Sequence, residues 1–255
     1  MTEAAPPTAG PRVLLMTATV VPEPNVSGRL AVLDPVDRRR QYEEALRSYA
    51  HRADGQLDGI VLAENSGADL SGFAEAVPPS VPLELLSIPA APSTPGSRRG
   101  YLEMALVADA FVASDLLRQP GAVGVKVTGR YQVENLGAVV RSMDPDQDLG
   151  FNLRRYPKPW ADMWVFFANQ HGMAALRPHL PAVGVTEPGG SAERSMFRIV
   201  NELHDQGVPV QRRFGVEPRL SGTRGFDGMR YDSPSQRVKW TTRTLARRVV
   251  PDLWI

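Results

Sequence analysis

Residues 12–17, with the sequence RVLLMT, form an apolar run that directly follows Pro11. An apolar run of this length without polar alternation is typical of a strand that is buried on both faces of a parallel sheet. Residues 58–63 (DGIVLA), 83–88 and 124–128 (GVKVT) show the same kind of pattern. The sequence therefore predicts four buried strands in the first half of the chain.

Helical patterns separate these strands. Asp34 and Pro35 suit the N-cap and the first turn of a helix over residues 37–51, and residues 101–117 place apolar side chains on one helical face. Strands that alternate with helices predict an α/β fold with a mainly parallel central sheet. Ligands of such sheets bind at the carboxyl ends of the strands, so we expect the functional site there.

The second half of the chain is less regular, and neither a repeat nor an interdomain linker is visible. We expect a strand at 164–168, a helix at 191–204 capped by Ser191, a strand at 208–214, a glycine-rich loop at 220–231 and a basic amphipathic helix at 236–250. The predicted organisation is a disordered leader (1–11), one α/β domain (12–231) and a basic C-terminal helical extension (232–255).

Composition and motif searches exclude several classes of protein. The 255 residues are 42% hydrophobic and 22% charged, which indicates a globular chain, and the net charge of +1 gives no argument for nucleic acid. The chain has no cysteine, which excludes disulfides and thiolate metal sites. It also lacks the GxSxG, P-loop, GxGxxG and HExxH motifs, a secretory signal and any apolar run near 20 residues. We expect a cytoplasmic protein.

The most unusual segment is Lys126-Val-Thr-Gly-Arg-Tyr131, because only three of the 29 basic residues are lysines. Lys126 and Thr128 share one face of the predicted strand, and Arg130 leaves the sheet at its ligand-binding end. Two neighbouring cations are costly unless an anion such as diphosphate lies between them. The alternative is a buried lysine that is paired with a carboxylate such as Glu103 or Glu134.

Other candidate segments each allow two interpretations. Arg99, Tyr101 and Glu103 lie at the start of a predicted helix. The backbone N–H groups there favour binding of an anion, or Arg99 belongs to a solvated arginine pair that has no ligand. Residues 221–223 (Ser-Gly-Thr) suit either a phosphate-binding turn or an ordinary loop. Asp144-Pro-Asp146-Gln-Asp148 is the only segment with an Asp-x-Asp pattern. Asp144 and Asp146 suit Mg²⁺ or Mn²⁺, but the segment follows a helix-like stretch and we interpret it as a surface loop.

Three segments together resemble the nucleotide-binding half of GT-A-type glycosyltransferases. They are the strand that ends near Thr17, the Glu64-Asn-Ser-Gly67 turn and the helix that opens with Gly100-Tyr-Leu-Glu103. The Lys-x-Thr-Gly-Arg-Tyr segment resembles a motif of bacterial sugar transferases from polysaccharide and secondary-metabolite gene sets. The resemblance covers residues 12–231 and implies a single Rossmann-like domain that binds a nucleotide-diphospho-sugar.

The resemblance also implies roles for individual residues. The acidic residue after the second strand would contact the base or ribose, and here it is Glu64. Taken alone, the Glu64-Asn-Ser-Gly67 segment suits an ordinary strand-to-loop turn equally well. The family's Asp-x-Asp metal motif is replaced by Thr128-Gly-Arg130, which implies that Lys126 and Arg130 neutralise the leaving diphosphate without a divalent metal. Mg or Mn on Asp144 and Asp146 is the alternative. The other expected donor-binding residues are Thr17, Ala18, Asn65, Ser66, Arg99, Tyr101, Glu103, Thr128, Gly129, Tyr131, Ser221, Gly222 and Thr223.

An acceptor hydroxyl needs a general base if the anomeric centre inverts. The candidates are Asp162, just before a predicted strand, Glu187, and Glu193 at the start of a helix; we favour Asp162 and Glu193, although each also suits a cap or an ion pair. The sequence thus predicts Lys126, Arg130, Asp162 and Glu193 as catalytic residues. Alanine at Lys126 or Arg130 is predicted to abolish transfer and to leave the fold intact.

The leading hypothesis is a cytoplasmic glycosyltransferase of bacterial glycan or natural-product biosynthesis, with a nucleotide-sugar donor and a glycan, lipid-linked or small-molecule acceptor. A nucleotidyltransferase is a second hypothesis, but residues 17–24 lack the glycine and the basic residue expected after its first strand. A non-catalytic nucleotide- or anion-binding module is the third. The basic C-terminal helix suits either a peripheral contact with the inner membrane face or docking on its own domain.

Overall fold

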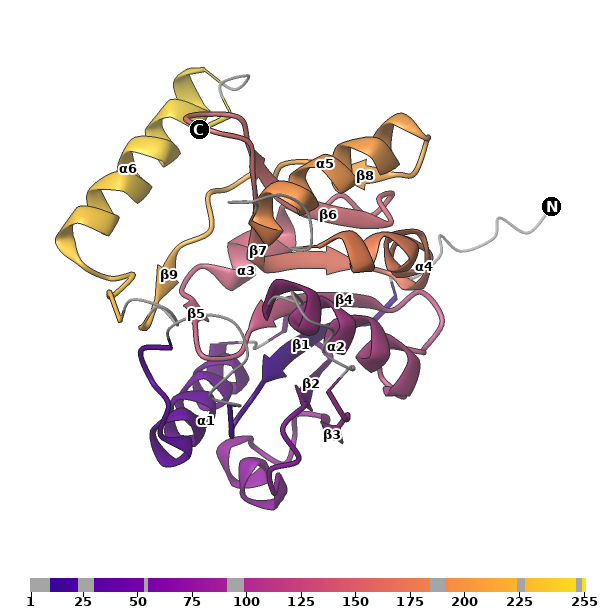
Figure 1. Cartoon of the computed structure of the whole chain (residues 1–255), viewed down its shortest axis with the longest axis vertical. Helices are drawn as coiled ribbons and strands as arrows, with labels where there is room; N and C mark the ends of the chain where they lie inside the picture. Colours follow the sequence, from indigo (N-terminus) through magenta and orange to yellow (C-terminus); the bar gives the residue numbers. More distant parts are fainter. Residues whose placement is uncertain are drawn as a thin grey trace.

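A seven-stranded sheet, with strand order β3-β2-β1-β4-β7-β6-β8, runs through the protein (Figure 1). The computed structural model describes residues 10–22, 30–52, 55–90, 99–183, 191–223, 228–250 and 254–255. A separate two-stranded ribbon pairs β5 with β9. The strands are β1 (Arg12–Ala18), β2 (Gly59–Glu64), β3 (Leu83–Ser87), β4 (Val123–Thr128), β5 (Gln132–Val133), β6 (Leu149–Arg154), β7 (Trp160–Ala168), β8 (Val210–Gln211) and β9 (Leu220–Ser221).

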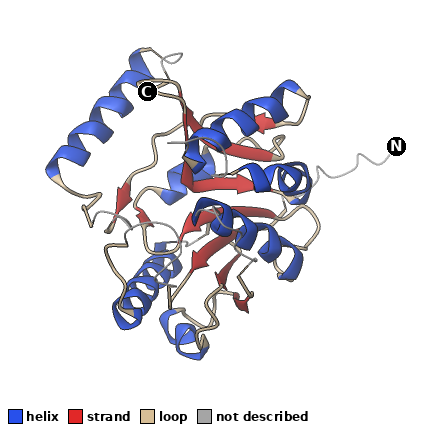
Figure 2. Ribbon diagram, viewed as in Figure 1, coloured by secondary structure: helices blue, strands red, loops and turns tan. Residues whose placement is uncertain are grey.

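Helices cover both faces of the sheet (Figure 2). The α-helices are α1 (Pro35–Arg52), α2 (Arg99–Ala113), α3 (Leu136–Arg141), α4 (Gln170–Leu176), α5 (Ala192–Asp205) and α6 (Pro234–Val249), and the 3₁₀-helices are η1 (Ser71–Ala76) and η2 (Arg177–Ala182). One core cluster joins the sheet to α2, α4 and α5, and the other joins it to α1, η1 and α3. Helix α6 stands to one side of the sheet (Figure 1), and none of its described side chains is buried.

Strand β1 shows why its sequence is apolar throughout. Val13 and Leu15 pack in the cluster with α2, whereas Leu14 and Met16 pack in the cluster with α1, and all four side chains are fully buried. Successive side chains of a strand point to opposite faces, so a strand covered on both faces needs apolar residues at every position. The apolar run therefore marks the centre of the sheet.

The sheet confirms the predicted α/β fold with a mainly parallel sheet in the first half of the chain. Strand β1 pairs in parallel with β2 and β4, and β2 pairs in parallel with β3. The second half differs, because β7 is antiparallel to both β4 and β6. Of the expected leader, only residues 10 and 11 fall within the described part of the chain.

Several predicted elements need correction. Strand β6, LGFNLR, was not predicted because Gly150 and Asn152 interrupt its apolar pattern. The expected strand at 208–214 contracts to Val210–Gln211, and the expected helix at 101–117 ends at Ala113. Strand β7 begins at Trp160, four residues earlier than expected, which places Asp162 inside the strand rather than before it.

Candidate functional site

A cleft of about 1680 Å³ opens at the carboxyl ends of β1, β2 and β4. Its walls also include the hairpin between β6 and β7, the segment at residues 217–220 and the start of α6. Since the carboxyl ends of parallel strands meet at one edge of the sheet, loops and side chains from distant parts of the sequence converge there. The position agrees with the expectation for an α/β sheet.

Small and polar side chains from the strand ends form the floor of the cleft. Thr17 and Ala18 at the end of β1 line it, as do Asn65 and Ser66 after β2. Thr19 Oγ1 donates to Asn65 Oδ1 at 2.7 Å, so the two strand ends are tied together. The sequence pattern placed these four residues in the site, and the structure brings them together.

Glu64 lies beneath the cleft instead of lining it. Its side chain is fully buried, and its carboxylate accepts hydrogen bonds from the backbone N–H groups of Val20 (3.0 Å), Ser66 (2.9 Å) and Ala68 (3.2 Å) and from the Ser66 hydroxyl. A carboxylate that satisfies several loop N–H groups fixes the conformation of that loop. The contact with base or ribose expected from the resemblance is therefore replaced by a role in shaping the loops after β1 and β2.

Lys126 forms a buried ion pair with Glu103. The Lys126 ammonium is fully buried and contacts Glu103 Oε1 at 2.6 Å, the Met163 carbonyl oxygen at 2.6 Å and Thr128 Oγ1 at 3.0 Å. Lys126 is not among the residues that line the cleft. Of the two interpretations that the sequence left open, the paired buried lysine describes this geometry, and direct contact with a diphosphate would require the pair to break.

Glu103, in contrast, faces the cleft. Its side chain is 27% exposed, and Oε1 accepts from the hydroxyls of Thr128 (2.8 Å) and Thr17 (3.1 Å) as well as from Lys126. Burial alone would raise the pKa of the Glu103 carboxyl, but the Lys126 ammonium and these donors outweigh it and hold the pKa below its ordinary value. All of its hydrogen bonds within the described residues use Oε1, which leaves Oε2 to accept from a ligand.

Arg130 projects into the cleft from the turn after β4. Its guanidinium donates to Gln41 Oε1 at 3.3 Å and lies 6.0 Å from the centre of the Tyr131 ring, which also lines the cleft. Within the described part of the chain, no carboxylate pairs with it. A guanidinium that has no counter-ion in a cleft is suited to bind an anionic ligand.

The whole cleft carries an excess of positive charge. Its described lining contains eight cations and four carboxylates. The cations are Arg38, Arg130, Arg154, Lys158, Arg219, Arg237, Lys239 and Arg243, and the carboxylates are Glu103, Glu193, Glu217 and Asp232. Clefts lined mainly by one sign of charge concentrate ligands of the opposite sign, so an anionic ligand suits this cleft.

Glu193 lines the cleft at the start of α5, where the Ser191 side chain accepts from the N–H of Arg194 and caps the helix as predicted. Burial, reinforced by the negative charges of Glu103 and Asp162, raises the pKa of the Glu193 carboxyl above its ordinary value of 4.5. A carboxylate with a raised pKa in a cleft is a candidate general base. Glu187, the other candidate in this region, lies outside the described residues.

Asp162 occupies a different environment from the one expected. It is fully buried, forms an ion pair with Arg154 and accepts from Asn152 Nδ2 at 2.7 Å. The ion-pair interpretation that the sequence left open therefore fits Asp162, because both of its oxygens are engaged and neither reaches the cleft. Its negative charge still acts on Glu193 through space.

Glu217, which was not predicted from the sequence, joins the cleft to α6. This buried carboxylate pairs with Arg247 at 2.6 Å and Arg243 at 3.6 Å, one helical turn apart on α6. Burial raises the pKa of the Glu217 carboxyl, and the two guanidinium groups oppose that effect. The spacing of the two arginines on one helix face was the available signal for a buried acidic partner.

The remaining predicted residues lie around the cleft rather than in its lining. Tyr101 and residues 221–223 are absent from the lining, where Gly100, Leu102 and Leu220 take part instead. Ser221 belongs to β9 and pairs with Gln132. The side chain of Arg99 lies outside the described residues.

Asp144 and Asp146 form a turn after α3 that is remote from the lining. Asp144 Oδ1 accepts from the N–H of Asp146 at 3.0 Å, so this carboxylate stabilises its own turn. Across the described ranges, no group of three or more histidine, aspartate or glutamate side chains is arranged to hold a metal ion. None of the helices in those ranges combines the length and the apolar character of a membrane span.

Gly129 allows the turn after β4 to pack tightly against β1. A Cβ atom at this position would lie 2.5 Å from the Thr17 carbonyl oxygen and 3.0 Å from Cδ1 of Tyr42. We expect Gly129→Ala to lower the free energy of unfolding by about 1–3 kcal/mol, as overpacking does elsewhere. Urea unfolding would measure the loss. Gly72→Ala is the control, since its methyl group would meet only the end of the Arg39 side chain, and an equal loss in both variants would contradict this account.

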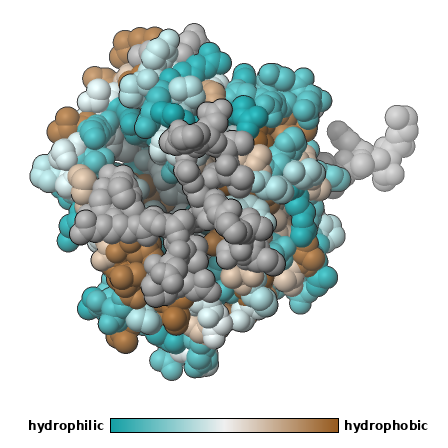
Figure 3. Space-filling model, viewed as in Figure 1, coloured by the Kyte–Doolittle hydropathy of each residue, from teal (hydrophilic) through white to brown (hydrophobic). Residues whose placement is uncertain are grey.

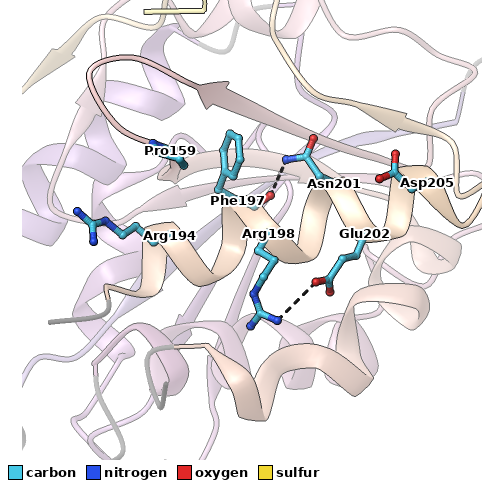
Figure 4. Close-up of a pocket in the computed structure, with 7 residues that line it drawn as sticks. All are labelled: Pro159, Arg194, Phe197, Arg198, Asn201, Glu202 and Asp205. Carbon is cyan, nitrogen blue, oxygen red and sulfur yellow. Dashed lines mark hydrogen bonds and ion pairs between the residues drawn. The ribbon is translucent and has the colours of Figure 1, made fainter. Parts of the chain in front are cut away.

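A second, shallower pocket lies on the outer side of α5 (Figure 4). Phe197 points to the side of the helix where Pro159 of the β6–β7 hairpin lies, and Asn201 Nδ2 donates to the Phe197 carbonyl at 2.7 Å. Arg198 and Glu202 form an exposed pair on the helix at 3.5 Å. These contacts are ordinary for a helix surface, so the large cleft is the candidate site.

No protein-family model and no curated protein matches the chain. Solved structures with a similar fold include a protein described as a nucleotide-diphospho-sugar transferase from Desulfovibrio desulfuricans, at 11% identity over 80% of this chain and 79% of that chain, with a TM-score of 0.45. A 4-diphosphocytidyl-2C-methyl-D-erythritol synthase from Anaerococcus prevotii is similar at 8% identity, with coverage of 92% and 99% and a TM-score of 0.44. HddC from Yersinia pseudotuberculosis is similar at 9% identity, with coverage of 91% and 98% and a TM-score of 0.46. These likenesses concern the fold alone.

Proposed function

We propose that the protein is a glycosyltransferase that moves a sugar from a nucleotide-diphospho-sugar to an acceptor hydroxyl. The observation that carries the proposal is Arg130, a cleft guanidinium with no carboxylate partner among the described residues, at the carboxyl end of β4. Arg130 would bind the diphosphate, and the polar ends of β1 and β2 beside it would bind the nucleoside. Glycan, lipid-linked and small-molecule acceptors all remain compatible with this proposal.

Arg130 would act on the leaving group. As the glycosidic bond to the nucleoside diphosphate breaks, negative charge grows on the diphosphate, and a positioned cation stabilises that charge. Lys126 would act indirectly as a positioning residue, because its ammonium holds Glu103 Oε1 and Thr128 in place. Glu103 Oε2 would then be oriented to accept a hydrogen bond from a hydroxyl of the donor.

Glu193 would be the general base for the acceptor. It lines the cleft, and its raised pKa makes it a better proton acceptor than an ordinary glutamate carboxylate. Asp162 is not proposed as the base, because its two carboxylate oxygens are bound by Arg154 and Asn152. We expect transfer to persist in EDTA, since the segment after β4 supplies an arginine where the GT-A-type glycosyltransferases that the sequence resembles carry an Asp-x-Asp motif.

The test combines ligand binding with a single substitution. Thermal-shift measurements with UDP-, GDP-, TDP- and CMP-sugars, each in EDTA or Mn²⁺, should show stabilisation by one nucleotide class in EDTA, and a ligand at 100 times its Kd stabilises by about 2.7 kcal/mol. Arg130→Ala should remove most of that shift, because a charge-assisted contact contributes about 1.5–3 kcal/mol. Arg141→Ala is the matched control, since this exposed arginine lies outside the cleft lining.

Other outcomes of these measurements would contradict the proposal. A shift that Arg130→Ala leaves unchanged would contradict the proposed diphosphate contact, and a shift only in Mn²⁺ would contradict metal independence. Release of pyrophosphate from a nucleoside triphosphate would replace the proposal with nucleotidyl transfer. Nucleotide binding without turnover of any donor, with acceptors supplied, would instead indicate a binding module.

A further inference from the structure

Helix α6 is attached to the protein by polar contacts on one face. Trp240 Nε1 donates to the Glu217 carbonyl oxygen at 3.1 Å, and the Arg243 and Arg247 guanidinium groups pair with the Glu217 carboxylate. Arg247 Nη1 also donates to the Phe214 carbonyl oxygen at 2.6 Å. These residues recur every three or four positions, so they define a single inner face of the helix.

The opposite, outer face of α6 carries a line of exposed apolar side chains. Val238, Leu245 and Val249 are 66%, 60% and 71% exposed. Their spacing of seven and four residues puts them in one line along the helix, opposite Trp240 and Arg247. In Figure 3, brown side chains appear along the outer edge of α6 between hydrophilic ones.

Cations flank this apolar line on both sides. At 100° per residue, Arg237 and Arg248 lie on one side of the line and Lys239 on the other, and all three residues are exposed. Helix α6 contains five basic residues and no acidic residue. Neither Lys239 nor Arg248 forms an ion pair with any other described residue.

We infer that the outer face of α6 docks on an anionic lipid bilayer. An exposed apolar line with cations on both flanks matches a helix that lies in the membrane interface, where the apolar side chains enter the acyl region and the cations meet lipid phosphates. A second copy of the same helix is a poor occupant, because it would bring two such sets of cations together. The charge of the face therefore selects a negatively charged surface.

This docking would place the cleft next to the bilayer. Arg237 and Lys239 flank the apolar line and also line the cleft, so the two surfaces share an edge. Because the inner face of α6 remains bound to Glu217, docking needs no rearrangement of the helix. The inference concerns an interaction surface and does not depend on the reaction that occurs in the cleft.

Vesicle sedimentation of the full chain tests the inference. We expect binding to phosphatidylcholine vesicles that contain roughly 30% phosphatidylglycerol, because an anionic surface attracts basic segments, and little binding to pure phosphatidylcholine. Leu245→Glu should weaken binding at least about tenfold, and Arg248→Glu roughly 25-fold, since each basic residue near an anionic surface strengthens binding by about fivefold and charge reversal counts this effect twice. Higher salt should weaken wild-type binding.

Matched variants on other helices separate this effect from general changes in charge. Val112→Glu places a carboxylate at an exposed apolar position of α2, and Arg141→Glu reverses an exposed charge on α3. Both should bind vesicles nearly as well as the wild type, and thermal unfolding should confirm that every variant is folded. Absence of wild-type binding to anionic vesicles at low salt would overturn the inference. Equal losses of vesicle binding in the α6 variants and in their controls would also overturn it. Self-association of the wild type that Leu245→Glu abolishes would overturn it as well.

Discussion

Replacing Glu193 by glutamine is expected to lower kcat for sugar transfer by about 10²–10⁴-fold, the contribution typical of a general base. Glutamine keeps the size of the side chain and removes only its capacity to accept a proton. Donor binding should change little, because the proposed diphosphate contact is made by Arg130. Initial rates with saturating donor, measured on the donor class identified by thermal shift, would give kcat directly.

The pH dependence of the activity is a second test of Glu193 as the general base. Only the ionised carboxylate accepts a proton, and the pKa of Glu193 is raised by burial and by its negative neighbours, so wild-type activity should fall on acidification at a pH above 4.5. The ionised form is the one that burial disfavours, so Glu193 lowers folding stability as the pH rises through the raised pKa. Glu193→Gln should therefore be at least as stable as the wild type at neutral pH.

Glu202→Gln is the matched control for Glu193→Gln. Glu202 lies on the same helix, has a side chain that is 43% exposed and pairs with Arg198 outside the cleft. Its substitution should leave kcat and the pH profile unchanged. If Glu193→Gln retained wild-type kcat across the profile, Glu193 would not be the base.

Replacing Lys126 by methionine is expected to lower the free energy of unfolding by about 3 kcal/mol, near the lower end of the range for breaking a buried ion pair. The Lys126 side chain is fully buried with three polar contacts, whereas Glu103 is 27% exposed and so retains some access to water. This expectation corrects the simpler one from sequence, in which a change at Lys126 leaves the fold intact. Chemical denaturation at neutral pH would measure the loss.

The double variant Lys126→Met/Glu103→Gln is the control, because it removes both charges and should recover much of the lost stability. The loss should also depend on pH. In the wild type the pKa of Glu103 is held below its ordinary value, so its contribution is lost only as the pH falls through that lowered pKa. Without Lys126, burial raises this pKa, so the difference between variant and wild type should shrink from pH 7 to pH 5. A difference that stays constant would contradict the ion-pair account.

The sequence by itself determined the first half of the fold. The apolar run at 12–17 belongs to a strand covered on both faces, and this local requirement is readable because every side chain of such a strand must be apolar. The Ser191 cap was equally local, since its hydroxyl contacts a backbone N–H only three residues away. Strand β6 escaped prediction because Asn152, which donates to Asp162, makes a buried strand look polar.

The candidate site was predictable only as a region. Strand ends meet at one edge of any parallel sheet, so Thr17, Asn65 and Thr128 could be brought together from the chain order alone. The roles of the charged residues could not be predicted from the sequence, because the ion-pair partners that determine those roles lie far away in the chain. Glu103 lies 23 residues from Lys126, and only the packing of α2 on the sheet shows that Lys126 is neutralised while Arg130 is left to meet a ligand. Local sequence thus determined the strands and the helix cap, whereas tertiary structure decided which charged side chains form ion pairs inside the protein and which face the cleft.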